Sequence, residues 1–128
     1  RWLFRRRAQG STAHRPAGIH LLADLAGINA TLLVDPDAID ALLRTAAVAA
    51  GARILHSHFH SFGAGMGVTG VLLLAESHIS IHTWPEHGFA AADIFMCGDA
   101  QPQQALDVID AALRPATRSV QTIARGQL

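Results

Sequence analysis

Three side chains capable of covalent or acid–base chemistry lie close together in the sequence: Ser77, His82 and the only cysteine, Cys97. A serine hydroxyl can attack the carbonyl of the preceding residue, here Glu76, when the peptide is strained and donors meet the oxyanion that forms. A neutral histidine is suited to accept a proton at pH 7, and a thiol can donate one. A Glu-Ser pair between two strands is, however, an ordinary tight turn in most proteins. A functional interpretation therefore depends on what surrounds the pair.

The residues that follow Ser77 have the pattern of a hairpin. Alternating side chains predict strands over residues 78–84 and 89–97, joined by a turn that contains proline and glycine. Pairing the strands about the centre of that turn returns Cys97 to the start of the first strand, beside Ser77. His82 shares its face of the strand with the other polar residues, because successive side chains point to opposite sides. The hairpin is therefore expected to gather an imidazole and the thiol at the turn that carries Ser77.

The rest of the chain predicts the layer that supports this hairpin. Asp35-Pro36-Asp37 supplies an N-cap, a proline at the first helical position and an acid in the first turn of a helix that Gly51 ends. Two helices are too few for a doubly wound sheet, and the hairpins imply antiparallel pairing. The expected fold is α+β, a two-layer α/β sandwich with a mostly antiparallel sheet and two helices on one face. Further strands are expected at 18–25, 53–62, 68–75 and 118–124, a glycine-rich loop at 63–67, and a second helix from Pro102 that ends before Pro115.

Composition limits the class of protein. The chain has 128 residues, is 50% hydrophobic and carries no net charge, so it predicts one globular domain without the basic surface of a nucleic-acid binder. Residues 1–17 are rich in arginine and contain no acid, and we interpret them as a basic flexible tail before a single domain at 18–128. No apolar run approaches the roughly 18–20 residues that span a bilayer. A membrane partner is therefore not expected.

Two residue counts bear directly on chemistry. The sequence contains no lysine, so the chain cannot hold pyridoxal phosphate as an internal Schiff base. Any Schiff-base chemistry would need a carbonyl group on the protein itself. A single cysteine cannot form an intrachain disulfide, which favours a reducing compartment, and we expect the cytoplasm.

Three short motifs together resemble a known family. Ala75-Glu76-Ser77-His78, Ile81-His82-Thr83-Trp84-Pro85-Glu86 and Cys97-Gly98-Asp99 are similar to the processing and catalytic segment of bacterial and archaeal S-adenosylmethionine decarboxylase proenzymes. The resemblance runs from about Gly18 to Arg125 and is densest from Val68 to Gly98. It implies a precursor that cuts itself between residues 76 and 77 and converts the serine into a covalent pyruvoyl cofactor.

The resemblance also implies roles for individual residues. Ser77 becomes the pyruvoyl group that forms a Schiff base with the substrate, His82 is the base for processing, and Cys97 is the proton donor. Thr69 stands where the family often has a serine that steadies the oxyanion, and it keeps the hydroxyl. The family further implies a homodimer of processed αβ protomers with an active site at the interface. No metal ion is expected.

The substrate implied by the resemblance is S-adenosylmethionine, and its decarboxylated product would be the aminopropyl donor for spermidine and other polyamines. Phe62, Trp84 and Glu86 match the positions that hold the nucleoside. The aromatic rings would offer flat surfaces to adenine or the sulfonium, and the carboxylate could bind ribose hydroxyls. The loop at 63–67 departs from the family, being longer and richer in glycine. Decarboxylation of L-ornithine or L-arginine by the same fold and cofactor is therefore an alternative.

Three other classes of protein are alternatives to this interpretation. His56, His58 and His60 recur at every second residue and could be metal ligands, together with His78, His82 and His87. Three ligands along one strand would spread over about 13 Å, too wide for one zinc ion unless the strand bulges. A hydrolase that uses Cys97 and His82 lacks any sign of an oxyanion hole for an external acyl substrate. A domain without enzymatic activity is the third alternative.

Overall fold

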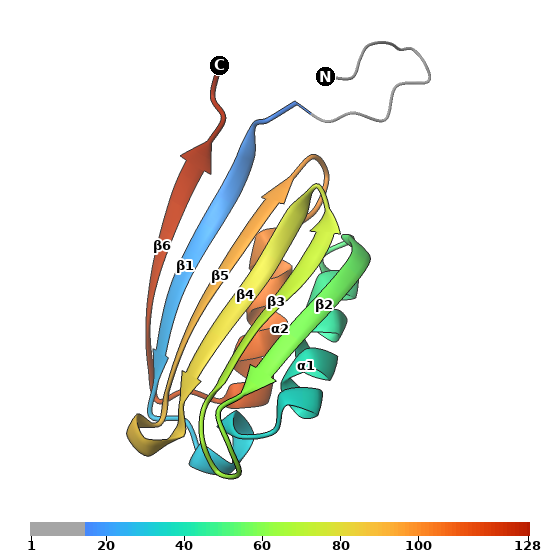
Figure 1. Ribbon diagram of the computed structural model, residues 1–128. Helices are drawn as coiled ribbons and strands as arrows, with labels where there is room; N and C mark the ends of the chain where they lie inside the picture. Colours follow the sequence, from blue (N-terminus) through green and yellow to red (C-terminus); the bar gives the residue numbers. More distant parts are fainter. Residues whose placement is uncertain (1–14) are drawn as a thin grey trace.

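A computed structural model describes residues 15–128 of the chain. The strands are β1 (Gly18–Ala26), β2 (Arg53–Ser61), β3 (Val68–Ala75), β4 (Ser77–Trp84), β5 (Phe89–Cys97) and β6 (Thr117–Arg125), and the α-helices are α1 (Pro36–Ala49) and α2 (Pro102–Leu113). The strands form one antiparallel sheet in the order β2-β3-β4-β5-β1-β6, and both helices cover the same face (Figure 1). The predicted two-layer α+β sandwich is confirmed.

The core lies between the sheet and the helices and follows strict alternation along the central strands. On β5, Ala90, Ala92, Ile94 and Met96 are buried, whereas the residues between them are partly exposed. Burying one face of each strand drives the layers together, because apolar surface leaves water on that side only. We call the sheet face away from the helices the open face. On β4 and β5 its side chains are His78, Ser80, His82, Trp84, Phe89, Ala91, Asp93, Phe95 and Cys97.

Helix α1 begins and ends at the residues that the sequence predicts. The Asp35 side chain accepts a hydrogen bond from the Asp37 N–H at 3.0 Å, and Pro36 occupies the first turn. Gly51 follows the helix with φ of 81°, a conformation that glycine adopts at little cost. The buried side of the helix consists of Ile39, Leu43, Ala46 and Ala47.

One short element has no clear signal in the sequence. Residues Ala30–Leu33 form a 3₁₀-helix, η1, whose start is capped by the Asn29 side chain. Residues distant in sequence hold this helix in place. The buried Thr83 hydroxyl donates to the Leu33 carbonyl at 2.7 Å and accepts from the Val68 N–H at 2.9 Å. Because these contacts join residues far apart in sequence, local patterns do not predict them. A second 3₁₀-helix, η2 (Pro85–His87), forms the expected turn between β4 and β5.

The two ends of the described chain lie close together, with Gly126 next to Pro16. Strand β6 pairs with β1 along its whole length and forms an edge, with every residue exposed. Of the expected basic tail, residues 1–14 lie outside the described range, whereas Arg15 and Pro16 reach the end of β5. None of the helices within residues 15–128 is long and apolar enough to cross a bilayer.

Candidate active site

The turn between β3 and β4 holds the predicted cleavage point in a rare backbone conformation. Glu76 has φ of 134°, a region that residues with a side chain seldom adopt. Its N–H donates to the Leu74 carbonyl at 3.1 Å, and Leu74 pairs with Ser77, so the chain reverses within two residues. Such a conformation costs on the order of 1–3 kcal/mol and persists only where the surrounding structure enforces it. The strain is thus located at the residue whose carbonyl Ser77 would attack.

Ser77 is the first residue of β4, and its side chain meets the end of β5. The Cys97 N–H lies 3.4 Å from Ser77 Oγ and donates to it. The next pair along the ladder is His78 with Phe95. The predicted hairpin register, which returns Cys97 to Ser77, is therefore confirmed.

The thiol of Cys97 is held in its neutral form. Burial raises the pKa of this thiol above its ordinary value, and the negative charge of Glu76 raises it further. The thiol lies 3.8 Å from the Pro16 carbonyl. A side chain at Gly18 would begin 2.9 Å from Cys97 Sγ, so glycine keeps the space beside the sulfur open. A neutral thiol can donate a proton at pH 7 but is a poor base or nucleophile.

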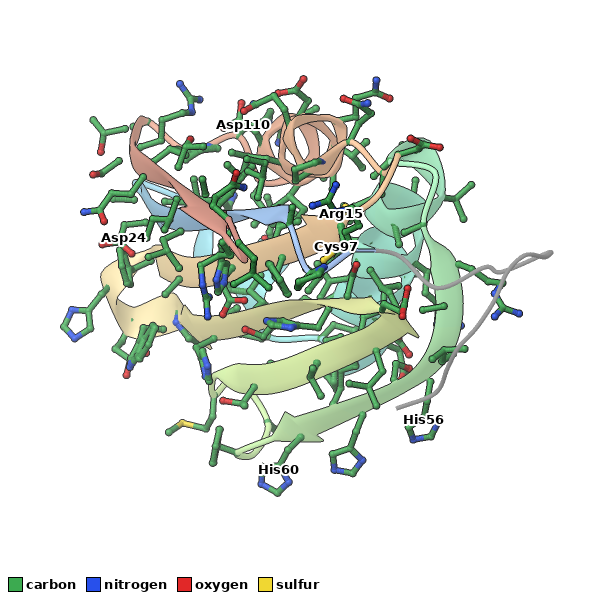
Figure 2. The ribbon with its side chains drawn as sticks, turned by 90° about the horizontal axis from the view of Figure 1, so that it is seen from above. Arg15, Asp24, His56, His60, Cys97 and Asp110 are labelled. Atoms are coloured by element: carbon green, nitrogen blue, oxygen red, sulfur yellow. The ribbon has the colours of Figure 1, made fainter. Side chains whose placement is uncertain are left out.

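A shallow cleft borders this thiol. It is lined by Arg15, Pro16, Glu76, Phe95 and Cys97, and Figure 2 shows Arg15 next to Cys97. Two of these residues belong to the segment that the sequence predicts as a tail. Their participation depends on where the chain enters β1, which no local pattern specifies.

A second group of predicted residues meets at the opposite end of β4. Thr69 and His82 are directly opposite each other on neighbouring strands, and Thr69 Oγ1 lies 3.1 Å from His82 Nδ1. This hydrogen bond fixes the plane of the imidazole and leaves Nε2 as the atom for proton transfer. The structure thus places the predicted hydroxyl and the predicted base together.

The same end carries a pocket of about 300 Å³ with flat apolar walls. The aromatic surface is accessible: Phe62 is 61% exposed and Trp84 is 40% exposed. At Gly67 a Cβ would collide with the Thr83 carbonyl, so the glycine allows the loop at 63–67 to lie against the pocket. The predicted Phe62, Trp84 and Glu86 therefore share one pocket. Its full lining is Phe62, Met66, Gly67, Thr69, His82, Thr83, Trp84 and Glu86.

The structure does not bring His82 to Ser77 of the same chain. The two residues are at opposite ends of β4, about 16 Å apart at roughly 3.3 Å per residue. An odd separation along a strand also directs their side chains to opposite faces. The expectation that the hairpin gathers this imidazole at the cleavage turn needs correction: the turn end holds Glu76, Ser77 and Cys97, and His82 lies with Thr69 and the aromatic pocket. The physical reason is the extended shape of the strand.

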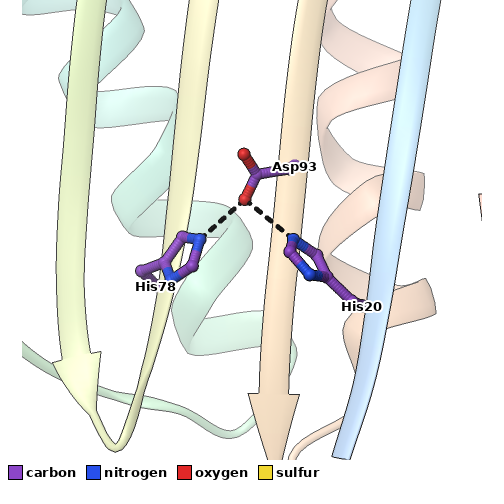
Figure 3. A group of neighbouring side chains, drawn as sticks. All are labelled: His20, His78 and Asp93. Carbon is purple, nitrogen blue, oxygen red and sulfur yellow. Dashed lines mark hydrogen bonds and ion pairs between the residues drawn. The ribbon is translucent and has the colours of Figure 1, made fainter. Parts of the chain in front are cut away.

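The sequence did not predict a partly buried polar cluster on the open face, on the inner strands β1, β4 and β5. Asp93 on β5 accepts from His78 Nε2 at 2.7 Å, from His20 Nε2 at 3.2 Å and from Ser80 Oγ at 2.6 Å (Figure 3). The hairpin register alone could have paired Ser80 with Asp93, but the contribution of β1 required the sheet order.

The alternating histidines of β2 do not converge. His56, His58 and His60 are exposed, and Figure 2 shows the labelled His56 and His60 pointing outward from the sheet. Among the described residues, the group with metal-ligand composition is instead His20, His78 and Asp93.

Comparison with known proteins agrees with the architecture and the motifs. Residues 19–126 match the sequence pattern of the family described as S-adenosylmethionine decarboxylase. The chain is 46% identical to the S-adenosylmethionine decarboxylase proenzyme of Sulfurihydrogenibium sp. (strain YO3AOP1), over 77% of this chain and 74% of that protein. It is 44% identical to the proenzyme of the same name from Aquifex aeolicus, over 85% of this chain and 81% of that protein.

A solved structure gives the same result for the fold. The crystal structure of the adenosylmethionine decarboxylase from Aquifex aeolicus superposes with a TM-score of 0.80 at 40% identity, covering 89% of this chain and 94% of that one. Agreement of the family pattern, the relatives and the fold over nearly the whole described range leaves one conclusion. The chain belongs to the S-adenosylmethionine decarboxylase family.

Proposed function

We propose that this chain is a self-processing, pyruvoyl-dependent decarboxylase of S-adenosylmethionine. The observation that carries the proposal is the strained Glu76 immediately before Ser77, at a turn that also receives the neutral thiol of Cys97. The names of the related proenzymes point to the same substrate. The product would be the aminopropyl donor for spermidine and polyamine biosynthesis. Because the thiol must stay reduced, we place the reaction in the cytoplasm.

Processing would use residues of the turn. Ser77 Oγ attacks the Glu76 carbonyl, and the peptide bond is replaced by an ester while the amine of residue 77 becomes free. A base then removes the Ser77 α-proton, which expels the Glu76 carboxylate and leaves dehydroalanine. Addition of one water and loss of one ammonia converts this group into a pyruvoyl group. Relief of strain at Glu76 favours the first step, which is otherwise uphill because an amide is more stable than an ester.

The surroundings of Ser77 fit a pyruvoyl group. A cofactor carbonyl at this position would border the cleft beside Cys97 and provide the electrophile that the lysine-free chain otherwise lacks. When present, this group supplies an electron sink for the bond that releases carbon dioxide. Cys97, kept neutral by its raised pKa, donates a proton to the α-carbon of the product. Arg15 lies close enough to this cleft to attract an anionic substrate carboxylate.

The separation of the two groups on β4 supports a homodimer with shared active sites. One chain offers Ser77 and Cys97 at one end and His82 and Thr69 at the other. Two open faces packed about a two-fold axis, with antiparallel β4 strands, would bring each serine end to the imidazole end of the second copy. His82 of the partner subunit would then remove the Ser77 α-proton, and Thr69 of the partner subunit would steady the oxyanion. Exposed leucines on the open face, Leu22 and Leu73, agree with a surface that becomes covered.

The aromatic pocket would bind the nucleoside part of the substrate. Phe62 and Trp84 present accessible ring faces to adenine and to the sulfonium, and Glu86 offers acceptors for ribose hydroxyls. The pocket of about 300 Å³ suits a nucleoside better than a small diamino acid, which would cover little of the aromatic surface.

Two measurements test the proposal. Intact mass of the purified, incubated protein should reveal a chain that ends at Glu76 and a second chain with a blocked N-terminus. Carbon dioxide release should then be measured in parallel from labelled S-adenosylmethionine, L-ornithine and L-arginine. We expect release from the first substrate. Release only from an amino acid would refute the substrate while leaving the cofactor in place, and a chain that stays whole would refute the cofactor.

A further inference from the structure

Cutting the chain before Ser77 removes the turn that holds residue 77 in place. In the intact chain this turn connects β3 to β4, with Leu74 paired to Ser77. After the cut proposed above, on which this inference rests, residue 77 begins a new chain. Chain ends are poorly ordered unless other contacts secure them. A reactive group at a chain end must nevertheless keep its orientation, because small misplacements lower the rate strongly.

The next residue, His78, pairs with Leu73 on β3 and Phe95 on β5, and its side chain adds a contact that does not depend on the turn. Its Nε2 lies 2.7 Å from Asp93 Oδ1, the shorter of the two imidazole contacts to that oxygen. Asp93 is held in turn by the Ser80 hydroxyl, at 2.6 Å from Oδ2. Figure 3 shows Asp93 between His78 on β4 and His20 on β1, so the cluster connects three neighbouring strands. None of these contacts involves Glu76 or the turn.

The hydrogen bonds of the cluster determine which nitrogen of His20 carries the proton and whether Asp93 is charged. Arg125 Nη1 lies 2.9 Å from His20 Nδ1 and can only donate, so the His20 proton is on Nε2, which faces Asp93. Partial burial alone would raise the pKa of Asp93, but the hydrogen bonds from Ser80, His20 and His78 outweigh it and lower that pKa. Asp93 is therefore an ionised acceptor at neutral pH.

The same three side chains have the composition of a divalent metal site, and their ligand atoms lie within 4.8 Å of one another. The position of Arg125 argues against this use. An imidazole that binds a metal through Nε2 carries its proton on Nδ1 and donates it outward. His20 Nδ1 instead accepts from a guanidinium, which also places a positive charge where a cation would bind. The geometry is that of a closed hydrogen-bond network.

We propose that His78 and Asp93 are positioning residues that anchor the new chain end after cleavage and so orient the group formed at residue 77. The carbonyl of residue 77 forms the amide to His78, so a fixed His78 side chain limits rotation of the first peptide unit. His20 and Ser80 support the anchor by holding Asp93. The anchor is redundant in the uncut chain, where the turn performs the same task.

Because the turn still holds residue 77 in the uncut chain, loss of the anchor should affect mainly the cut form. Hydrogen exchange at residues 78–81 is compared between cut protein and uncut protein that carries Ser77→Ala, each with and without His78→Leu. We expect His78→Leu to speed exchange about tenfold or more in the cut form and less than about twofold in the uncut form. A merely structural contact would loosen both forms alike, and that result would overturn the anchor.

Matched variants separate the hydrogen bond from bulk and charge. His78→Gln keeps a donor that can reach Asp93 and should restore most of the protection. His56→Leu replaces an exposed histidine on β2 and should change neither form. If His78→Leu fails to fold, Asp93→Asn removes the charge at nearly constant size and should give the same difference between forms in a smaller amount. Equal exchange in its two forms would likewise contradict the proposal.

Kinetics provide a second readout. In the cut enzyme, His78→Leu should lower kcat about tenfold or more and change KM by less than about threefold, because orientation rather than binding is lost. A rise in KM at constant kcat would overturn the assignment. Denaturing electrophoresis separates failure of the proposed function from failure of the anchor. A wild-type chain that is never cleaved refutes both. Normal cleavage without the difference in hydrogen exchange refutes the anchor alone.

Discussion

The two ends of β4 hold their reactive groups by different physical means. At the Ser77 end the backbone is strained at Glu76, and the thiol of Cys97 is neutral because burial and a nearby negative charge raise its pKa. At the His82 end the backbone is regular, and the imidazole is fixed by one hydrogen bond to Thr69 beside a pocket with aromatic walls. The first end is suited to breaking the chain, and the second to binding and proton transfer.

In the proposed mechanism, neither end of β4 is a complete active site. His82, the proposed base, and the strained peptide at Glu76 lie at different ends, because an extended strand keeps Ser77 and His82 about 16 Å apart. A second copy in the opposite orientation would make both sites complete. Variants at the two ends can therefore separate roles that a single-chain view would merge.

The largest effect is expected at the serine. Ser77→Ala removes the nucleophile, so cleavage and decarboxylation should be abolished, as measured by intact mass and carbon dioxide release. Ser119→Ala on β6, an exposed strand serine, is the matched control and should be processed normally. Two fragments from the Ser77→Ala protein would show that the cut occurs elsewhere.

The next effect tests whether the two ends cooperate across chains. The His82→Ala protein should accumulate the ester intermediate and be cleaved slowly. Hydroxylamine, which cleaves esters, should release the two fragments. Co-expression with Ser77→Ala should restore cutting of the His82→Ala chain, because the mixed dimer contains one complete site. Co-expression with the Ser77→Ala, His82→Ala double variant supplies no imidazole and is the control. Equal cutting in both mixtures would contradict shared sites, and a failure of hydroxylamine would contradict the role of His82 in elimination.

A smaller effect is expected at the thiol. Cys97→Ala should still give two chains, but turnover should fall by roughly 10²- to 10⁴-fold, as is typical for loss of a general acid. Because the raised pKa keeps the donor protonated at neutral pH, kcat of the natural enzyme should fall only as the pH rises through that raised value. The variant should lack this alkaline decrease. Full activity in Cys97→Ala would remove the residue from the mechanism.

The smallest effect concerns the pocket at the far end. Stacking on one aromatic ring contributes on the order of 1 kcal/mol beyond area burial, so Phe62→Ala or Trp84→Ala should raise KM for S-adenosylmethionine several-fold. Processing should be nearly unchanged. Val48→Ala, at an exposed position on α1, controls for loss of apolar surface. A fall in kcat without a change in KM would contradict a role of these rings in substrate binding and indicate a role in the chemical step.

Much of the fold could be predicted because its signals are local. The cap at Asp35, the stop at Gly51 and the alternation along β5 each depend on residues within a few positions of one another. The short helix η1 could not be predicted in this way, since it is held by Thr83, which is distant in sequence. The same holds for Arg15 and Pro16 at the cleft.

The sequence by itself determined the order of the elements, the hairpin register that joins Cys97 to Ser77, and the residue types needed for the chemistry. These features depend on periodicity, turn residues and short motifs, which act over neighbouring positions. Only the tertiary structure decided that Asp93 accepts hydrogen bonds from both His20 and His78, and that Pro16 approaches the thiol of Cys97. Both depend on how β1, which is distant in sequence, aligns with β5, and strand order is set by packing of the whole sheet on its helices.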